Sequence, residues 1–197
     1  MDTLTALLTR RAYGRLSAPA PSAAEIRLLL EAAAAAPDHG ALRPFRFTVL
    51  QGETQDAFGV VLEAAYRKRC RTAQLEPDAA KAAKERTKLG RAPLVIVVAA
   101  SRQASEKIPW ADQRDAAVAS AMSIVLAAHA LGYGAMWRTG TSCDDDDVKS
   151  AIGRAPDDAI VGFIYIGTID QPKAAKLIDL DGLVAKFPIS VSPSAKV

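Results

Sequence analysis

The stretch Asp115–Gly140 decides the fold of this chain and reads D-A-A-V-A-S-A-M-S-I-V-L-A-A-H-A-L-G-Y-G-A-M-W-R-T-G. Between Ala116 and Leu131 the only polar side chains are those of Ser120, Ser123 and His129. A helix over these residues is apolar on almost every side, so we expect it to be buried on most faces. Its many Ala and Ser residues let neighbouring backbones approach closely, which suits a helix packed between a sheet and a second subunit.

Gly132 predicts the end of this helix, because a glycine directly after the last apolar position readily adopts the left-handed cap conformation. The residues that follow, Gly134–Trp137, form a short apolar run that predicts a strand. Arg138 and Thr139 stand at the exit of that strand. We therefore expect the helix and the strand together to position a polar site at Arg138 and Thr139.

A membrane span is the alternative interpretation of so long an apolar run, because about 20 apolar residues suffice to cross a bilayer. The run is rich in alanine, which contributes little transfer energy, and two serines and a histidine interrupt it. Asp112, Arg114 and Asp115 crowd one end without the excess of basic residues that marks a cytoplasmic flank. A helix of the protein core is therefore favoured.

Length and composition indicate a globular, soluble chain. Its 197 residues, half of them apolar, suffice for one large domain, which can bury about 70% of its unfolded surface. Lys and Arg number 25 against 22 Asp and Glu, and both signs are scattered along the chain. This distribution shows neither a nucleic-acid footprint nor a polybasic membrane anchor. We expect its partners to be small molecules.

Cysteine usage and the N-terminal residues favour the cytosol. Cys70 and Cys143 form no C-x-x-C pair. The first residues, M-D-T-L-T-A, lack both the basic start and the apolar segment of a signal peptide. We therefore predict a cytoplasmic protein.

The N-terminal residues predict a short helix that ends in a pair of arginines. Asp2 can cap this helix, and its apolar face is formed by Leu4, Leu7 and Leu8. Arg10 and Arg11 follow, and two interpretations of them remain open. They are either favourable charges at a helix C-terminus, worth about 0.3–1 kcal/mol, or a clamp for an anion such as phosphate, which guanidinium groups bind bidentately.

A constrained loop follows the second predicted helix. Ser22 and Glu25 match a capping box, and Pro37 ends the helix that they begin. The loop P-D-H-G-A-L-R-P leads into the strand Phe45–Leu50 and carries His39, one of two histidines in the chain. A histidine alone is more often an incidental polar residue than a catalyst. Because no carboxylate cluster stands at ligand spacing, a metal site is not expected.

The middle of the chain predicts two helices and a central strand. Residues 57–69 are amphipathic, and residues 77–89 form a charged segment that contains Lys81, Lys84, Glu85 and Lys88. We interpret these charges as a solvated face, with a mobile cover over a pocket as a second hypothesis. Pro93–Ala100 is continuously apolar, which is typical of an interior strand in a sheet covered on both faces.

Four consecutive aspartates, Asp144–Asp147, resemble a metal cluster until their position is considered. They precede an apolar helical pattern that Gly153 closes, so we interpret them as acidic residues that stabilise a helix N-terminus.

Ile160–Gly167 is a further apolar strand. The tail beyond it cannot form its own core and is expected to wrap along the body or over a partner subunit. Three prolines break this tail, namely Pro172, Pro188 and Pro193.

The predicted elements alternate between helices and strands and indicate a mixed β-sheet flanked by helices, within one domain that spans residues 1–197. The chain contains no G-x-G-x-x-G after a strand, no G-x-x-x-x-G-K-[ST], no G-x-S-x-G and no H-E-x-x-H. Periodicity and spacing therefore predict an α/β or α+β domain with arginine-bearing loops, and they identify no catalytic residue.

Three stretches taken together resemble a known family. They are the N-terminal L-L-T-R-R-A-Y-G-R-L, the loop A-P-D-H-G-A-L-R-P-F-R-F, and the strand G-Y-G-A-M-W-R-T-G with the later I-V-G-F-I-Y-I-G. Their order and spacing resemble the FMN-dependent nitroreductases, in particular the short bacterial members, from Met1 to about Thr168. The resemblance implies an α+β fold that dimerises through its long central helices and builds two FMN sites at the interface.

The resemblance also implies roles for individual residues. FMN contacts carried over by position are Arg10, Arg11, Ala12, Trp137, Arg138 and Thr139, with His39 reaching the flavin of the partner chain. This favours the anion clamp, because FMN carries a phosphate of charge about −1.5 to −2 and its reduced ring is negative near N1. The segment matching the part assigned to the pyridine nucleotide consists of Ala127, Ala128, His129, Ala130, Leu131 and Gly132.

Two positions depart from the family pattern. Ala12 stands where the family usually has a serine, so a hydroxyl that could bind the flavin is missing. Ala35 stands at a cofactor-binding position where close relatives have an arginine. Both changes bear on how FMN is held.

The function implied by the resemblance is electron transfer from NADH or NADPH, through FMN, to nitroaromatic or quinone-type acceptors in a ping-pong scheme. The flavin supplies the hydride, so no side chain is assigned as a catalytic acid. One alternative is a flavoprotein of this fold that acts on a specific metabolite. A second alternative is a non-catalytic flavin-binding dimer.

Overall fold

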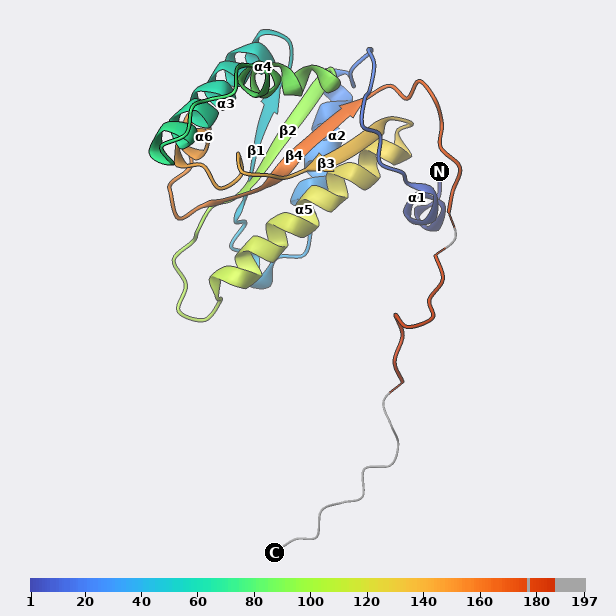
Figure 1. The fold of residues 1–197 in the computed structure, drawn as a ribbon. Helices are drawn as coiled ribbons and strands as arrows, with labels where there is room; N and C mark the ends of the chain where they lie inside the picture. Colours follow the sequence, from blue (N-terminus) through green and yellow to red (C-terminus); the bar gives the residue numbers. More distant parts are fainter. Residues whose placement is uncertain (177, 187–197) are drawn as a thin grey trace, which may run out of the picture.

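A four-stranded sheet forms the centre of the computed structural model, which describes residues 1–176 and 178–186 (Figure 1). The strands are β1 (Phe45–Leu50), β2 (Leu94–Ala100), β3 (Gly134–Arg138) and β4 (Ala159–Gly167). Their order is β1-β2-β4-β3, and every neighbouring pair is antiparallel. The sequence predicts a sheet with both parallel and antiparallel pairing. Among the described residues, the only parallel pairing is one isolated bridge, between Ala12 and Ala135 at the β3 edge.

Helices cover both faces of this sheet, as predicted (Figure 1). They are α1 (Thr3–Thr9), α2 (Ala23–Ala34), α3 (Glu53–Thr72), α4 (Ala79–Thr87), α5 (Trp110–Ala130) and α6 (Asp146–Ala151), with the 3-10 turns η1 (His39–Ala41) and η2 (Lys88–Arg91). One hydrophobic cluster joins α2 and α5 to the sheet, and a second joins α3, η2 and α6 to the opposite face. α4 packs on α3.

β2 is the interior strand that its apolar sequence predicts. All seven of its residues are buried, because β1 and β4 pair with its two edges and helices cover its two faces. Alternate residues enter the two clusters, with Val97 on the α3 side and Val98 on the α5 side.

The long central helix is confirmed, and it is longer than predicted. α5 begins at Trp110, before the predicted Ala116, because its first turns carry polar side chains that weaken the apolar signal. One of them, Gln113, is buried and ties the preceding loop to the helix through bonds to Gln103 and Ile108. The helix ends as predicted, since Gly132 has a φ of +91°.

Capping also agrees with the sequence. Asp2 accepts a hydrogen bond from Thr5 N, and Ser22 and Glu25 form the predicted capping box. Asp145 accepts from the backbone N–H groups of Asp147 and Val148, so the aspartate run begins a helix. Throughout residues 1–176 and 178–186, no group of three or more His, Cys, Asp and Glu side chains is arranged to hold a metal ion.

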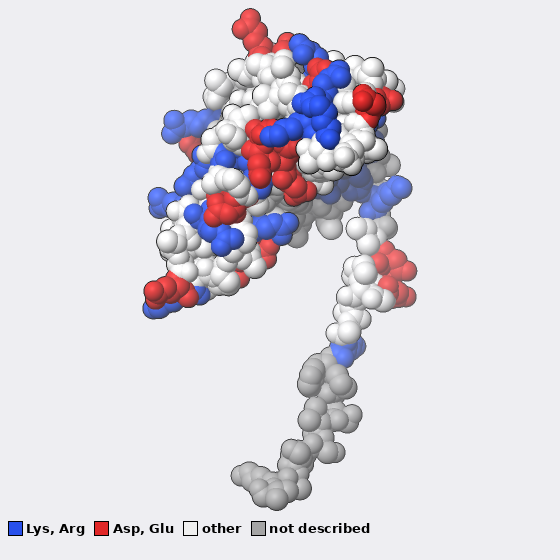
Figure 2. Space-filling view, turned by 60° about the vertical axis from the view of Figure 1, so that its left-hand side comes forward, with Lys and Arg blue, Asp and Glu red and all other residues white. Residues whose placement is uncertain are grey.

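The surface of the single chain is mixed in charge and locally apolar. Basic and acidic side chains are interspersed on one face (Figure 2). None of the described helices is both long enough and apolar enough to cross a membrane. The apolar face of α1 is uncovered, because Leu4, Leu7 and Leu8 are 68%, 47% and 71% exposed.

The tail runs from β4 along the N-terminal segment and then away from the body (Figure 1). Arg11 donates from Nε to the Ala174 carbonyl at 3.1 Å and from Nη2 to the Lys176 carbonyl at 3.2 Å. Further along, the large apolar side chains are exposed: Ile178, Leu180, Leu183 and Val184. Pro188 and Pro193 lie outside the described residues.

Candidate functional site

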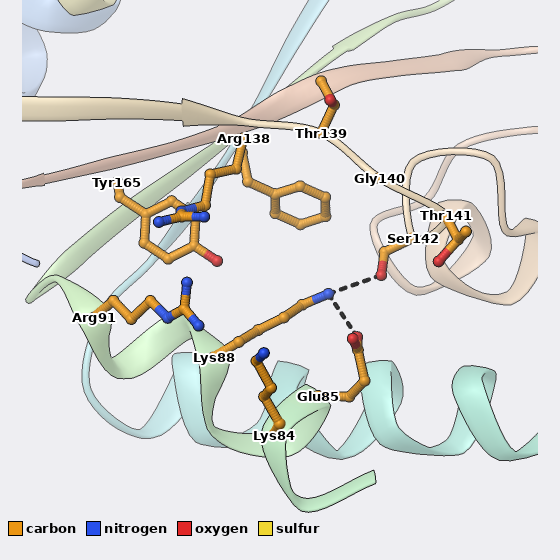
Figure 3. Close-up of a pocket in the computed structure, with 11 residues that line it drawn as sticks. Lys84, Glu85, Lys88, Arg91, Arg138, Thr139, Gly140, Thr141, Ser142 and Tyr165 are labelled. Carbon is orange, nitrogen blue, oxygen red and sulfur yellow. Dashed lines mark hydrogen bonds and ion pairs between the residues drawn. The ribbon is translucent and has the colours of Figure 1, made fainter. Parts of the chain in front are cut away.

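A polar cavity, here called the β3 cavity, opens where β3 ends (Figure 3). Its volume is about 260 Å³, slightly below the range of about 300–1,000 Å³ in which small-molecule sites usually fall. The strand register sets Met136 opposite Tyr165 and Arg138 opposite Phe163, so Arg138 and Tyr165 project from the same face of the sheet. The lining residues are Lys84, Glu85, Lys88, Arg91, Arg138, Thr139, Gly140, Thr141, Ser142, Phe163 and Tyr165.

Cations dominate the wall of the β3 cavity. Lys88 donates from Nζ to Glu85 Oε2 at 2.6 Å and to Ser142 Oγ at 2.9 Å (Figure 3). Within the described part of the chain, the other three cations form no ion pair, namely Lys84, Arg91 and Arg138. Four cations thus face one carboxylate, and the positive field of the cavity suits an anionic ligand.

Tyr165 provides a neutral donor and an aromatic face in this cavity. Burial raises the pKa of Tyr165 to about 12, against the lowering effect of Arg138 and Arg91. Its phenol therefore stays protonated at neutral pH. The guanidinium carbon of Arg138 lies 5.8 Å from the centre of the Tyr165 ring, within the range of a cation–π interaction.

The N-terminal arginine segment runs along the same strand. Ala12 bridges Ala135, and Tyr13 N donates to the Ala135 carbonyl at 3.2 Å. A Cβ added to Gly14 would lie 3.6 Å from Arg138 Nη2. The fold therefore brings this segment and the end of β3 to one edge of the sheet.

Arg10 and Arg138 share a feature that points to a missing acceptor. The Nε atoms of both are buried and have no hydrogen-bond partner among the described residues, a condition found otherwise only at Ser120 Oγ. A buried donor on a charged group is costly to leave unpaired. Both arginines are among the FMN contacts that the resemblance implies, so the residues present fit a phosphate-bearing flavin.

The tail adds a cation of which the sequence pattern gives no sign. Lys173 donates from Nζ to the Ala12 carbonyl at 2.6 Å and lies 5.0 Å from the centre of the Tyr13 ring. It therefore stands beside the residue at which the family serine is missing. Only the return of the tail to the N-terminal segment brings it there.

The interpretation of residues 77–89 as a solvated face is wrong in part. Lys84 and Lys88 line the β3 cavity, and the Lys88 side chain is only 22% exposed. This segment therefore forms part of the cavity wall, and the second hypothesis, a mobile cover over a pocket, stays a prediction. A signal was present in the spacing, because Lys84, Lys88 and Arg91 recur at intervals of four and three, which places them on one side of a helix.

Other predicted residues lie apart from the β3 cavity within one chain. An apolar groove between α1, α2 and α5 is lined by Ala35, Ala127 and Ala130, together with Leu7 and Leu126. The Ala127–Gly132 segment forms the end of α5 and the turn after it. Its proposed contact with a pyridine nucleotide stays a prediction.

His39 and Trp137 each contact another residue of the same chain. His39 is exposed in η1, and its Nδ1 lies 3.1 Å from Asp112 Oδ2. Trp137 Nε1 donates to the Val161 carbonyl at 3.0 Å, and a Cβ on Gly162 would lie only 2.1 Å from that nitrogen. The indole thus packs against the sheet on its α5 side. The contacts of both residues with FMN stay predictions.

The sequence is similar to one protein family and to named bacterial proteins. The model described as "Nitroreductase family" matches residues 7–168. The chain is 36% identical to "Putative NAD(P)H nitroreductase YdjA" of Escherichia coli (strain K12) over 180 residues, which cover 91% of this chain and 94% of that protein.

Solved structures share the fold. A nitroreductase-like family protein from Bacillus cereus has a TM-score of 0.78 at 19% identity, with 95% of this chain and 96% of that chain covered. A "putative nitroreductase in complex with fmn" from Desulfovibrio desulfuricans has a TM-score of 0.73 at 25% identity, with coverage of 95% and 98%. Because the family model spans most of the sequence and the similarity to YdjA extends over nearly all of it, this protein belongs to the nitroreductase family.

Proposed function

We propose that this protein is a cytoplasmic, homodimeric oxidoreductase that uses FMN to carry electrons from NADH or NADPH to nitroaromatic or quinone-type acceptors. Residues 1–197 form its single FMN-binding domain. Family membership, the name of the Escherichia coli relative and the FMN in the Desulfovibrio structure support this proposal. The observation in this chain that carries it is the pair of buried arginine Nε atoms, on Arg10 and Arg138, without an acceptor.

The N-terminal segment holds the FMN phosphate in this proposal. Arg10 offers an unpaired buried donor, and guanidinium groups bind phosphate oxygens bidentately. Arg11 anchors the tail beside it, which brings Lys173 next to Ala12. The ammonium group of Lys173 thus supplies the positive charge and the donors that Ala12 cannot.

The β3 cavity receives the flavin ring, in contact with Arg138 and Thr139. When bound, FMN would supply the hydride chemistry between the nicotinamide and the acceptor, in a ping-pong scheme. The cations of the wall favour the negative charge that the reduced ring carries near N1. Tyr165 remains a neutral donor at working pH, because its pKa is about 12. No side chain is required as a catalytic acid.

A second subunit covers the apolar face of α1 and the groove beside it. Leu4, Leu7 and Leu8 are exposed in the single chain, and the groove between α1, α2 and α5 is mainly alanine and leucine. A large exposed apolar region is typical of an interface. The partner subunit's His39 completes each flavin site.

Absorption spectra of the protein, purified with added FMN and then freed of unbound flavin, test this function. We expect a yellow protein whose visible bands are bleached anaerobically by NADH or NADPH and restored by a nitroaromatic compound or a quinone. Free FMN at the same concentration is the control for direct reduction. A protein that takes up no FMN, or whose bound FMN neither nucleotide bleaches, contradicts the proposal.

A further inference from the structure

The wall of the β3 cavity contains one carboxylate among its four cations, and that carboxylate is bonded to one of them. We propose that Glu85 is a positioning residue that holds Lys88 in place and limits the redox potential of the bound flavin by opposing the positive charge of the wall. This inference rests on the proposed function, because it requires the flavin ring to lie in the β3 cavity.

Lys88 is fixed from two sides. Its Nζ donates to Glu85 Oε2 at 2.6 Å and to Ser142 Oγ at 2.9 Å, so the ammonium group spans from α4 to the loop after β3 (Figure 3). The side chains of Lys88 and Glu85 are 22% and 19% exposed, and Ser142 is buried. Lys88 therefore cannot turn toward solvent without leaving both partners.

The negative charge of Glu85 acts on the Tyr165 phenol inside the cavity. Burial is the main reason that the pKa of Tyr165 is raised to about 12, and Arg138 and Arg91 lower it. Glu85 acts on the same phenol in the opposite direction to the two arginines and raises its pKa. A ligand beside Tyr165 is expected to experience the same opposition between Glu85 and the arginines.

The charges of the cavity wall change the relative stability of oxidised and reduced flavin, because the two forms of the ring differ in charge. Reduction by a nicotinamide adds two electrons and one proton to the ring, so an anionic reduced ring carries one more negative charge than the oxidised ring. The cations favour the reduced form, whereas Glu85 disfavours it, because like charges repel in a partly desolvated site. Glu85 thus lowers the redox potential of the bound flavin, which favours electron transfer from the reduced flavin to the acceptor.

The midpoint potential of bound FMN tests this inference, measured by anaerobic reductive titration of the full-length holoenzyme with reference dyes. Glu85→Gln removes the charge but leaves an amide oxygen that accepts from Lys88. We expect it to favour reduced over oxidised flavin about tenfold, which raises the potential by about 30 mV for a two-electron couple. Lys88→Met is expected to shift the potential downward.

Two matched controls accompany these variants. Glu31→Gln removes the same charge from an exposed ion pair with Arg27 on α2, and Lys81→Met removes a lysine of α4 that lies on the Tyr66 ring outside the cavity. Both are expected to keep the wild-type potential. Opposite shifts in the two test variants, with unchanged controls, would not arise from a general disturbance of the fold.

The inference is overturned if Glu85→Gln has the potential of Glu31→Gln, or if both test variants shift in the same direction. Should Glu85→Gln not fold, Lys88→Met decides alone, and a potential equal to that of Lys81→Met overturns the inference. A wild-type protein that binds no FMN refutes the proposed function and this inference with it. A wild-type protein that binds and reduces FMN, with no response to Glu85→Gln, refutes this inference only.

Discussion

The Thr9 hydroxyl determines which ring nitrogen of His129 carries the proton. Thr9 Oγ1 donates its single hydrogen to the Thr5 carbonyl at 2.6 Å, so it can only accept from His129 Nε2, which lies 2.9 Å away. Nδ1 is then the nitrogen that titrates. Burial lowers the pKa of His129, and the positive charges of Arg10 and Arg11 lower it further.

This histidine is expected to make the protein less stable in acid. Its folded-state pKa lies below the ordinary value of 6.5, so the unfolded chain binds a proton more readily than the folded chain does. The stabilisation is complete above pH 6.5 and is lost as the pH falls through the folded-state pKa. In His129→Gln, whose amide can still donate to Thr9, urea unfolding is expected to show a smaller loss of stability than wild type between about pH 7.5 and about pH 5.5. Equal losses in the two proteins contradict this assignment.

Individual site residues differ in how far sequence alone reveals them. Arg10 follows the end of α1 and Arg138 is the last residue of β3, so their placement is visible in the local pattern. Ser142 and Lys173 carry no such pattern, because their roles arise from contacts with Lys88 and Ala12 that are distant in the sequence. The resemblance to the nitroreductases implies FMN contacts for Arg10 and Arg138 but implies no role for Ser142 or Lys173.

α3 and α4 approach each other closely at Gly59. A Cβ at this position would lie 2.1 Å from the carbonyl oxygen of Arg86. Because that atom belongs to the backbone, the helix itself would have to move. The glycine therefore sets the distance between the helices, and through it the position of Lys84 and Glu85 in the cavity wall.

Gly59→Ala is expected to destabilise the protein by about 1–3 kcal/mol, the usual range for overpacking a well-filled interior. It is also expected to weaken FMN binding, since α4 forms part of the cavity wall. Urea unfolding and flavin titration measure the two effects. Gly90→Ala is the control, because no atom lies within 4 Å of the Cβ that it adds. Wild-type stability in Gly59→Ala would be incompatible with the described packing of α3 on α4.

Whole elements were predictable where their signals are local. β2 follows from an uninterrupted apolar run and α6 from the aspartates that cap it. The predicted start of α5 is too late, because the first two turns of the helix contain the polar residues Asp112, Gln113 and Arg114. The exposure of α1 could not be read from its apolar pattern, which is the same whether its cover comes from its own chain or from another.

At the scale of the whole molecule, the uncovered apolar surface of α1 and α5 predicts a dimer with twice the 20.8 kDa mass of the chain. Leu126→Glu places a charge in the half-buried wall of the apolar groove, and desolvating it at an interface is costly. We expect this variant to be monomeric and to lose bound FMN. Light scattering after size-exclusion chromatography and the flavin absorbance measure both properties.

Val60→Glu serves as the control for this variant. Val60 is 44% exposed on α3, which covers the opposite face of the sheet, so the variant is expected to remain dimeric and yellow. Monomeric wild-type protein, or a dimeric and fully flavin-loaded Leu126→Glu protein, contradicts the proposed interface.

The affinity of the apoprotein for FMN, compared with its affinity for riboflavin, tests most directly whether cationic side chains of this chain bind a phosphate-bearing flavin. Titrations followed by flavin fluorescence give both dissociation constants. Wild type is expected to bind FMN at least about tenfold more tightly, because hydrogen bonds to charged groups contribute about 1.5–3 kcal/mol. Arg10→Ala should remove most of this preference, whereas Arg27→Ala, at an exposed position of α2, should keep it. If wild-type protein binds riboflavin as tightly as FMN, the proposed phosphate site does not exist.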